Sequence, residues 1–256
     1  MKTRTIAAFL LAASAANVLL AADGTWTAGT GGDWSVVGNW QDDLPAEGAG
    51  STAFINAGSG TITNDMTDLA LLGVQFAGGG YTLAGNTVTL DSAGFITVLG
   101  GSHTVSAPLS LSGNTAVRAA LNESLILDGA LSGAGGVTAN GGRVVLGNAA
   151  NAYAGQTVLQ TGLLEVASLD ALGDYTGPVI LGKGTFRYAG TAPGDLTQGY
   201  TVNSGGGNAS TVLDVQTNLT VSGKVDVTGS QGRVLKTGPG TLTYTRSEEH
   251  TSELQS

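Results

Sequence analysis

Few residues of this chain could carry out acid–base or nucleophilic chemistry. It contains two histidines, His103 and His250, and no cysteine. His103 could in principle join a Ser–His–Asp triad, but no G-x-S-x-G turn accompanies it. It stands in GGSHTVSAP, where residue types alternate, so we expect His103 to face outward from a strand. No pair of nucleophile and base can therefore be assigned.

Carboxylates are the second candidates for chemistry, because paired carboxylates can hydrolyse glycosides. Asp42, Asp43 and Glu47 form one local acidic group beside Pro45. Adjacent aspartates on a strand point to opposite faces, and in a loop with proline and glycine they are commonly solvated. Other carboxylates stand alone in the sequence, namely Glu165, Asp214 and Asp226. The sequence therefore predicts no catalytic residue, and we expect the protein not to be an enzyme.

Metal, cofactor and nucleic-acid sites lack their usual signatures. There is no H-x-x-x-H, no cysteine cluster and no D-x-D-x-D-G calcium loop, so no metal ligand is predicted. GAGG at residues 133–136 lacks the Lys-Ser/Thr and the helix that a phosphate loop needs, so no cofactor is expected. The ten basic residues are scattered in a chain of net charge −9, which argues against nucleic-acid binding.

The elements that must position these residues are short strands. From residue 51 onward, runs of four to seven residues alternate apolar with polar types and end at Gly, Asn, Asp or Ser. The best helical candidate is residues 167–174, at about two turns. The 42 glycines and 41% hydrophobic content together favour a folded, all-β chain over a disordered one.

Two segments repeat one pattern, G-x-G-T-[FL]-x-Y. GKGTFRY occupies residues 182–188 and GPGTLTY residues 238–244, and a looser copy, GGRVVL, occupies residues 141–146. A fixed pattern that recurs in a chain of short strands favours a repeat array over chance.

Residues 131–168 resemble an autotransporter-associated β-strand repeat, also called a passenger-associated transport repeat. Asn151, Tyr153 and Gly155 match the Asn-x-Tyr-x-Gly turn of that family. VLKTGPGTLTY at residues 234–244 matches its opening strand, including Lys236, and the tryptophan-rich start is similar to the opening of large exported proteins with such repeats. The first copy departs from the pattern, with Ala139 where Lys is usual and Arg143 where Thr is usual.

The resemblance implies a right-handed parallel β-helix, a solenoid whose turns hydrogen-bond to one another about 4.8 Å apart. With the usual solenoid period of about 20–25 residues, residues 51–245 would form roughly eight or nine turns. A β-sandwich is the alternative, but it would not explain the repeated G-x-G-T motif. Because the last repeat copy is not followed by its turn, the helix is expected to be truncated at its C-terminal end.

All three tryptophans, Trp26, Trp34 and Trp40, lie in residues 23–50. An uncovered solenoid end exposes strand edges, so this segment is predicted to be an N-terminal cap. The alternative is an aromatic platform on which sugars stack, with these three residues as glycan contacts. Buried tryptophans are commoner than ligand platforms, which favours the cap.

The two ends of the chain differ in composition from the rest. Residues 1–22 combine Lys2 and Arg4 with an apolar stretch and small residues, the pattern of a cleaved secretory signal peptide. An uncleaved membrane anchor is the alternative, but Ser14 and Asn17 interrupt the apolar run.

Residues 246–256, RSEEHTSELQS, show no β alternation and contain no glycine. Back-translated with one choice of codons, they look like a widely used sequencing-library adapter, so we interpret them as an artefact that lies outside the β-helix. The alternative is a genuine acidic tail. On the adapter interpretation, His250 belongs to no site.

Together these features predict a non-catalytic exported β-helix fragment, a passenger-like surface stalk, adhesin or matrix protein of a bacterium. Its expected partners are surface glycans or other cell-surface proteins, and any membrane attachment would lie in a C-terminal region beyond this sequence. The alternative is an enzyme or binding module that acts on polysaccharide. An enzyme should show charged residues that recur on one face of neighbouring turns, whereas the charges here look scattered.

Overall fold

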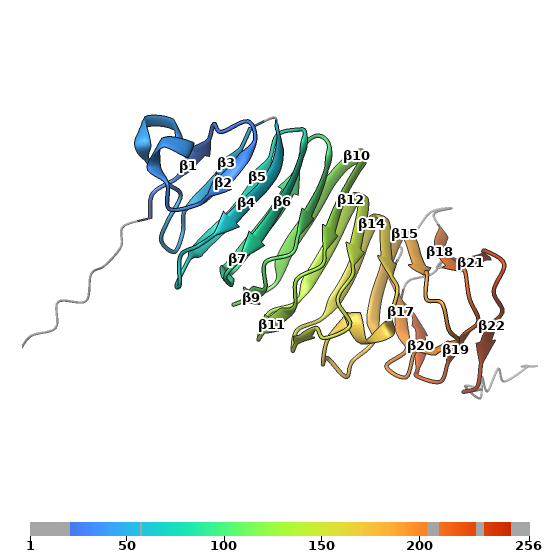
Figure 1. Cartoon of the computed structure of the whole chain (residues 1–256). Helices are drawn as coiled ribbons and strands as arrows, with labels where there is room; N and C mark the ends of the chain where they lie inside the picture. The colour runs from blue at the N-terminus through green and yellow to red at the C-terminus, as the bar shows by residue number, and fades with distance from the viewer. Residues whose placement is uncertain (1–20, 57, 204–209, 229–232, 247–256) are drawn as a thin grey trace, which may run out of the picture.

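The computed structural model of the protein describes residues 21–56, 58–203, 210–228 and 233–246. It is an elongated, all-β solenoid of parallel strands with about eight turns (Figure 1). Most of the expected signal segment and residues 247–256 of the expected tail lie outside the described residues. No helix among the described residues has the length and hydropathy needed to cross a membrane.

The strands are short where a turn has a sharp corner and longer where one strand continues round it. Their bounds are β1 Gly24–Trp26, β2 Gly31–Asp33, β3 Thr52–Ile55, β4 Ser59–Asn64, β5 Ala70–Phe76, β6 Gly80–Gly85, β7 Val88–Val98, β8 Ser102–Val105, β9 Leu109–Leu111, β10 Thr115–Leu127, β11 Leu131–Gly133, β12 Val137–Leu146, β13 Ala152–Tyr153, β14 Thr157–Val166, β15 Val179–Tyr188, β16 Gly194–Asp195, β17 Tyr200–Val202, β18 Ser210–Val215, β19 Leu219–Val221, β20 Val225–Val227, β21 Arg233–Thr237 and β22 Leu242–Tyr244.

Three faces run along the solenoid. The first face consists of β1, β3, the second halves of β5 and β7, the first halves of β10, β12, β14 and β15, and then β17 and β20. The second face consists of β2, β4, β6, β8, the second halves of β10, β12, β14 and β15, and then β18 and β21. The third face begins with the first halves of β5 and β7 and continues through β9, β11 and β13.

The spacing between paired residues gives the length of a turn. Val137 pairs with Thr157 and Tyr200 with Val225, so neighbouring turns are 20 to 25 residues apart over most of the chain. Every pairing between the named strands is parallel. The expected parallel β-solenoid and its period are therefore confirmed.

A single hydrophobic core fills the interior. Side chains alternate between inside and outside along each strand, and a one-residue slip would exchange the two sets. One inward row on the second face is in register from turn to turn and almost completely buried: Leu125, Val144, Leu164, Phe186 and Leu213. Each such side chain contributes about 1.5–3 kcal/mol through its burial.

The corner between the first and second faces requires glycine. Gly162 has a φ of 81°, and a Cβ placed on it would collide with the carbonyl oxygen of Gly141 on the preceding turn. Only a residue without a side chain fits there, which explains why glycines recur at this corner.

The solenoid starts earlier than the sequence indicated. β1 and β2 pair in parallel with β3 and β4, so strands of the first turn lie inside residues 23–50, the segment that we predicted to be an N-terminal cap. The part of that segment between Trp34 and Glu47 contains two short 3-10 helices instead, η1 Val37–Asn39 and η2 Gln41–Asp43.

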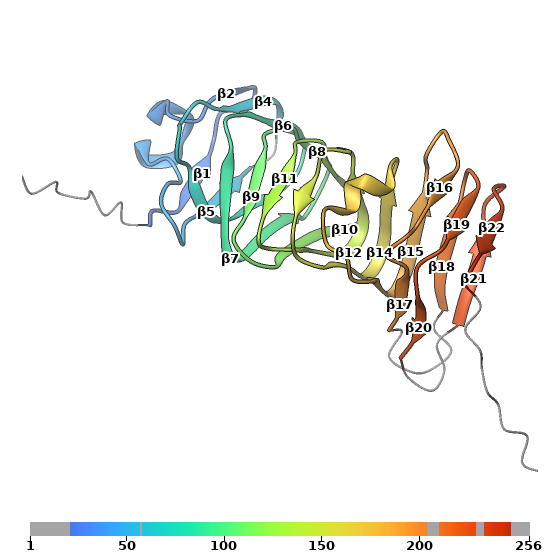
Figure 2. The same ribbon diagram turned by 90° about the horizontal axis from the view of Figure 1, so that it is seen from below.

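The third face is interrupted once. After β14 the chain forms a short 3-10 helix, η3 Leu169–Leu172, within the stretch that the sequence favoured as helical. Ser168 caps it by accepting a hydrogen bond from the backbone N–H of Asp170. Beyond η3, β16, β19 and β22 continue this side as a separate sheet (Figure 2).

Candidate functional site

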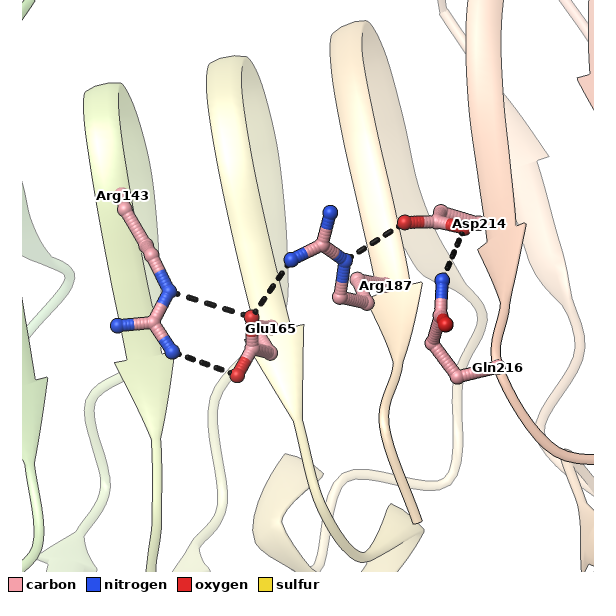
Figure 3. A network of polar contacts seen from close by, with 5 residues as sticks. All are labelled: Arg143, Glu165, Arg187, Asp214 and Gln216. Carbon is pink, nitrogen blue, oxygen red and sulfur yellow. Dashed lines mark hydrogen bonds and ion pairs between the residues drawn. The ribbon is translucent and has the colours of Figure 1, made fainter. Parts of the chain in front are cut away.

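Four charged side chains form a line across consecutive turns of the second face (Figure 3). Arg143 places Nη2 2.7 Å from Glu165 Oε1 and Nε 3.2 Å from Glu165 Oε2. Arg187 lies 3.3 Å from Glu165 Oε2 through Nη1 and 2.6 Å from Asp214 Oδ2 through Nε. Gln216 also donates to Asp214. We call Arg143, Glu165, Arg187 and Asp214 the charge ladder.

Strand register brings the charge ladder together. Glu165 in β14 pairs with Arg187 in β15, which pairs with Asp214 in β18, so these three side chains leave the sheet on the same side. Arg143 in β12 is two residues away from the residue that pairs with Glu165, and its long side chain reaches across diagonally. The sequence separates these residues by 22 to 27 positions, which conceals their contact.

The two arginines of the ladder favour the ionised form of Glu165. Burial alone would raise the pKa of Glu165, but the hydrogen bonds and charges of Arg143 and Arg187 outweigh it and lower the pKa. The hydrogen bond to Asp214 is the main reason that the pKa of Arg187 is raised. The carboxylate side chains are 14% and 10% exposed, so these pairs are better shielded from water than ordinary surface pairs.

This arrangement corrects the expectation that Glu165 and Asp214 are isolated and that charges are scattered. Charges do recur on one face of neighbouring turns, as a polysaccharide-cleaving β-helix would require. They are nevertheless paired with arginines, and an acid catalyst needs a raised pKa, the opposite of what Glu165 shows. Asp226 also has a partner, Lys224, at 2.9 Å. The ladder therefore suits cross-linking of turns better than catalysis.

The three tryptophans pack together at the N-terminal end. The ring of Trp40 meets Trp26 at 5.1 Å and Trp34 at 4.8 Å between centroids, both edge to face. Each indole N–H donates to a backbone carbonyl: Trp26 to Ala28, Trp34 to Ala46 and Trp40 to Trp34.

The burial of these rings bears on both interpretations of the segment. Trp26 and Trp34 are 0% exposed and Trp40 is 2% exposed. A sugar stacks on a free ring face, and none of these rings offers one to solvent. The burial of Trp26, Trp34 and Trp40 thus argues against direct glycan contact and favours a packing role at the end of the solenoid.

His103 was expected to face outward, and this expectation is wrong. It is 1% exposed and stacks on Phe76. Nδ1 accepts a hydrogen bond from the backbone N–H of Tyr81, so the proton lies on Nε2, which donates to the carbonyl of Gly100. Burial is the main reason that the pKa of His103 is lowered. Both ring nitrogens are occupied, which leaves no base for a catalytic triad.

The acidic group beside Pro45 is on the surface. Asp42 and Asp43 are exposed and adopt positive φ values of 56° and 57° in the turn that contains η2. Glu47 lines a cleft of about 610 Å³ with Asp65 and Asp68. Asp65 is engaged by Ser35, whose hydroxyl and backbone N–H both donate to it and lower its pKa. Within the described ranges, no group of three or more His, Cys, Asp or Glu could hold a metal ion.

One curated protein resembles most of the chain. Over 214 residues the sequence is 31% identical to a protein of Brucella suis biovar 1 (strain 1330) described as "Adhesin BmaC autotransporter". The alignment covers 82% of this chain but only 6% of that protein, so the chain spans a small part of its relative's length. No protein-family model matches the chain, and no solved structure matches it. A likeness to an autotransporter adhesin and a β-solenoid fold together fit a passenger-type repeat protein.

Proposed function

We propose that this chain is part of an exported, non-catalytic passenger-type protein that serves as an adhesive stalk at a bacterial surface. The observation that carries the proposal is the combination of the parallel β-solenoid with 31% identity to an autotransporter adhesin over 82% of the chain. A solenoid of stacked turns suits a stalk, because it extends along one axis while each turn is supported by its neighbours.

The specific repeat family also belongs to the proposal. Asn151 and Tyr153 of the matching turn are buried, and Asn151 joins three turns by accepting from Leu131 N–H and donating to the carbonyl of Ala171. That role suits a repeat in which the asparagine recurs. We infer that the autotransporter-associated β-strand repeat describes this part of the chain.

An enzyme that acts on polysaccharide is the second candidate, and the charge ladder is the feature that it would use. Its carboxylates are neutralised by Arg143 and Arg187. The decisive measurement is turnover of a polysaccharide panel by the full chain and by a Glu165→Gln variant. Turnover that disappears in the variant would replace the proposed stalk by an enzyme, whereas we expect no turnover by either protein.

Export is tested with residues 1–22 placed before a reporter that is active only outside the bacterial cytoplasm. We expect activity with these residues and none when they are deleted. Equal activity in both would contradict export.

Adhesion is tested by displaying residues 23–245 on a non-adherent bacterium through an outer-membrane anchor. Cells that carry the anchor alone are the control, and equal attachment of both to host cells and abiotic surfaces would contradict an adhesive role.

A further inference from the structure

The strands of the first face carry no acidic residue over most of the solenoid, although the protein as a whole is acidic. The chain has 19 Asp and Glu against ten Lys and Arg. Yet the strand segments that form the first face from β3 to β17 contain no Asp or Glu, and the first carboxylate on a strand of this face is Asp226 in β20. An anion that approaches along this face would meet no negative strand residue.

Polar side chains form one outward row on this face. The row consists of Gln75, Thr97, Arg118, Asn140 and Gln160, one from each of five consecutive turns. The side chain of Asn140 donates to Gln160 at 3.0 Å, which continues the row where no strand pairing is assigned. Neighbouring members are separated by about 4.8 Å, the spacing of paired strands. We call this set the polar row.

A hollow continues the polar row. The next position after Gln160 is Gly182, which has no side chain, and Asn203 lies on the following turn. The gap is a depression of about 270 Å³ lined by Val158, Leu159, Gln160, Ile180, Gly182, Lys183 and Asn203. The hollow therefore combines the amide side chains of Gln160 and Asn203 and the ammonium group of Lys183 with apolar walls.

Two cationic side chains lie along the polar row and the hollow. Arg118 stands in the polar row and Lys183 lines the hollow, and both are exposed. Within the part of the chain that the structure describes, neither forms an ion pair, in contrast to Arg143 and Arg187 of the charge ladder. Three turns separate Arg118 from Lys183, which corresponds to about 14 Å along the axis.

We propose that the polar row and the hollow bind a linear acidic polysaccharide that lies along the solenoid axis. The proposal rests on the adhesive function above and names its ligand class. One sugar ring occupies the hollow against Val158 and Ile180, while the amides of Gln160 and Asn203 bond its hydroxyls. Lys183 and Arg118 bind carboxylate or sulfate groups on this sugar and on another farther along the chain.

Charge spacing favours a polysaccharide over a nucleic acid. A nucleic-acid strand carries one phosphate per about 3.4 Å, and its affinity comes from neutralising many of them. Two cations about 14 Å apart would leave most phosphates unpaired, whereas they suit a polymer whose acidic groups are sparse. The polar row supplies hydrogen-bond donors and acceptors between them, as a hydroxyl-rich chain requires.

The test compares the full chain with an Arg118→Gln/Lys183→Gln variant on immobilised polygalacturonate, hyaluronate and heparin. Dextran serves as the neutral polymer and single-stranded DNA as the competing anion. We expect binding to at least one acidic polysaccharide that weakens between 50 and 200 mM salt, because exposed charge pairs are screened. The variant should bind at least about tenfold more weakly, as expected for loss of two charged hydrogen-bonding contacts.

The matched control is Arg233→Gln, which removes one exposed cation from β21 on the second face. It should change the affinity less than twofold, and Arg118→Lys/Lys183→Arg should retain binding. Wild-type binding by the double variant, no binding to any acidic polysaccharide, equal binding to dextran, or tighter binding to DNA would each overturn the inference. None of these outcomes affects export or attachment to cells, so the proposed function is judged separately.

Discussion

His103 stacks on Phe76 inside the solenoid, with 4.3 Å between the ring centroids and 23° between the ring planes. A neutral imidazole fits this position because its Nδ1 accepts from one backbone N–H and its Nε2 donates to one carbonyl. A protonated ring would place a second N–H against the donor of Tyr81 and a charge in the core.

We therefore predict that acid destabilises the protein through His103. Its folded-state pKa is lowered, mainly by burial, so the histidine stabilises the fold above its unfolded pKa of about 6.5. That contribution is lost as the pH falls from about 6.5 through the folded-state pKa. Urea unfolding at pH 7.5, 6.5 and 5.5 should show falling stability. A His103→Gln variant should lose most of this slope, while His250→Gln should keep it, and equal slopes in all three proteins would contradict the prediction.

Arg187→Met should destabilise the protein by about 1–3 kcal/mol. The substitution removes the ion-pair partner of Asp214, whose side chain is shielded from water. The matched control is Lys224→Met, which breaks an exposed pair with Asp226 and should cost less than about 1 kcal/mol. A double-mutant cycle of Arg187→Met with Asp214→Asn, measured by urea unfolding, gives the coupling energy. A coupling indistinguishable from zero would show that the ladder does not link these turns.

Trp34→Ala should lower the unfolding free energy by about 3–5 kcal/mol, since the ring is fully buried and its N–H bonds Ala46. Trp34→Phe should be milder, because most of the packing remains. In the wild-type protein, iodide should quench the tryptophan fluorescence weakly until the protein unfolds. Strong quenching of the folded protein would instead favour an exposed aromatic platform.

Gly162→Ala should be strongly destabilising, by about 1–3 kcal/mol or more, because it combines a positive φ with a collision against Gly141. Gly38 offers a matched control, since its φ is not positive and a Cβ there would meet no atom within 4 Å. Gly38→Ala should leave the melting temperature nearly unchanged. Similar effects of the two substitutions would mean that the corner is less constrained than the structure indicates.

The repeating strands could be predicted from sequence because alternation and turn residues are local signals. The two G-x-G-T copies lie in β15 and directly before β22, which the solenoid brings to different turns and different faces. The two copies therefore do not occupy equivalent positions, and the expected period came from the usual solenoid repeat rather than from their spacing. His103 was misplaced because alternation fixes which residues share a side but not which side is inside.

The charge ladder was not predicted, because Arg143, Glu165 and Arg187 meet only through strand register. Their spacing of 22 residues matches the period of the solenoid, and a search for charges at that spacing would have found them. Lys236 is a second residue whose neighbour in the fold could not be read from the sequence. It matched a repeat pattern, but its neighbour across the strand pair is the buried Leu213, a relationship that no local pattern contains.

The direction of the hydrogen bonds between turns determines how the solenoid would respond to pulling. These bonds join one turn to the next and run roughly along the axis, so a load on the two ends opens them in succession rather than shearing them together. A turn such as the one between Val137 and Thr157 releases 20 residues, which extend to at most about 70 Å. Single-molecule stretching should therefore show steps near this length. The highest forces should fall on the turns that the arginine pairs connect, so the solenoid would unfold turn by turn rather than all at once.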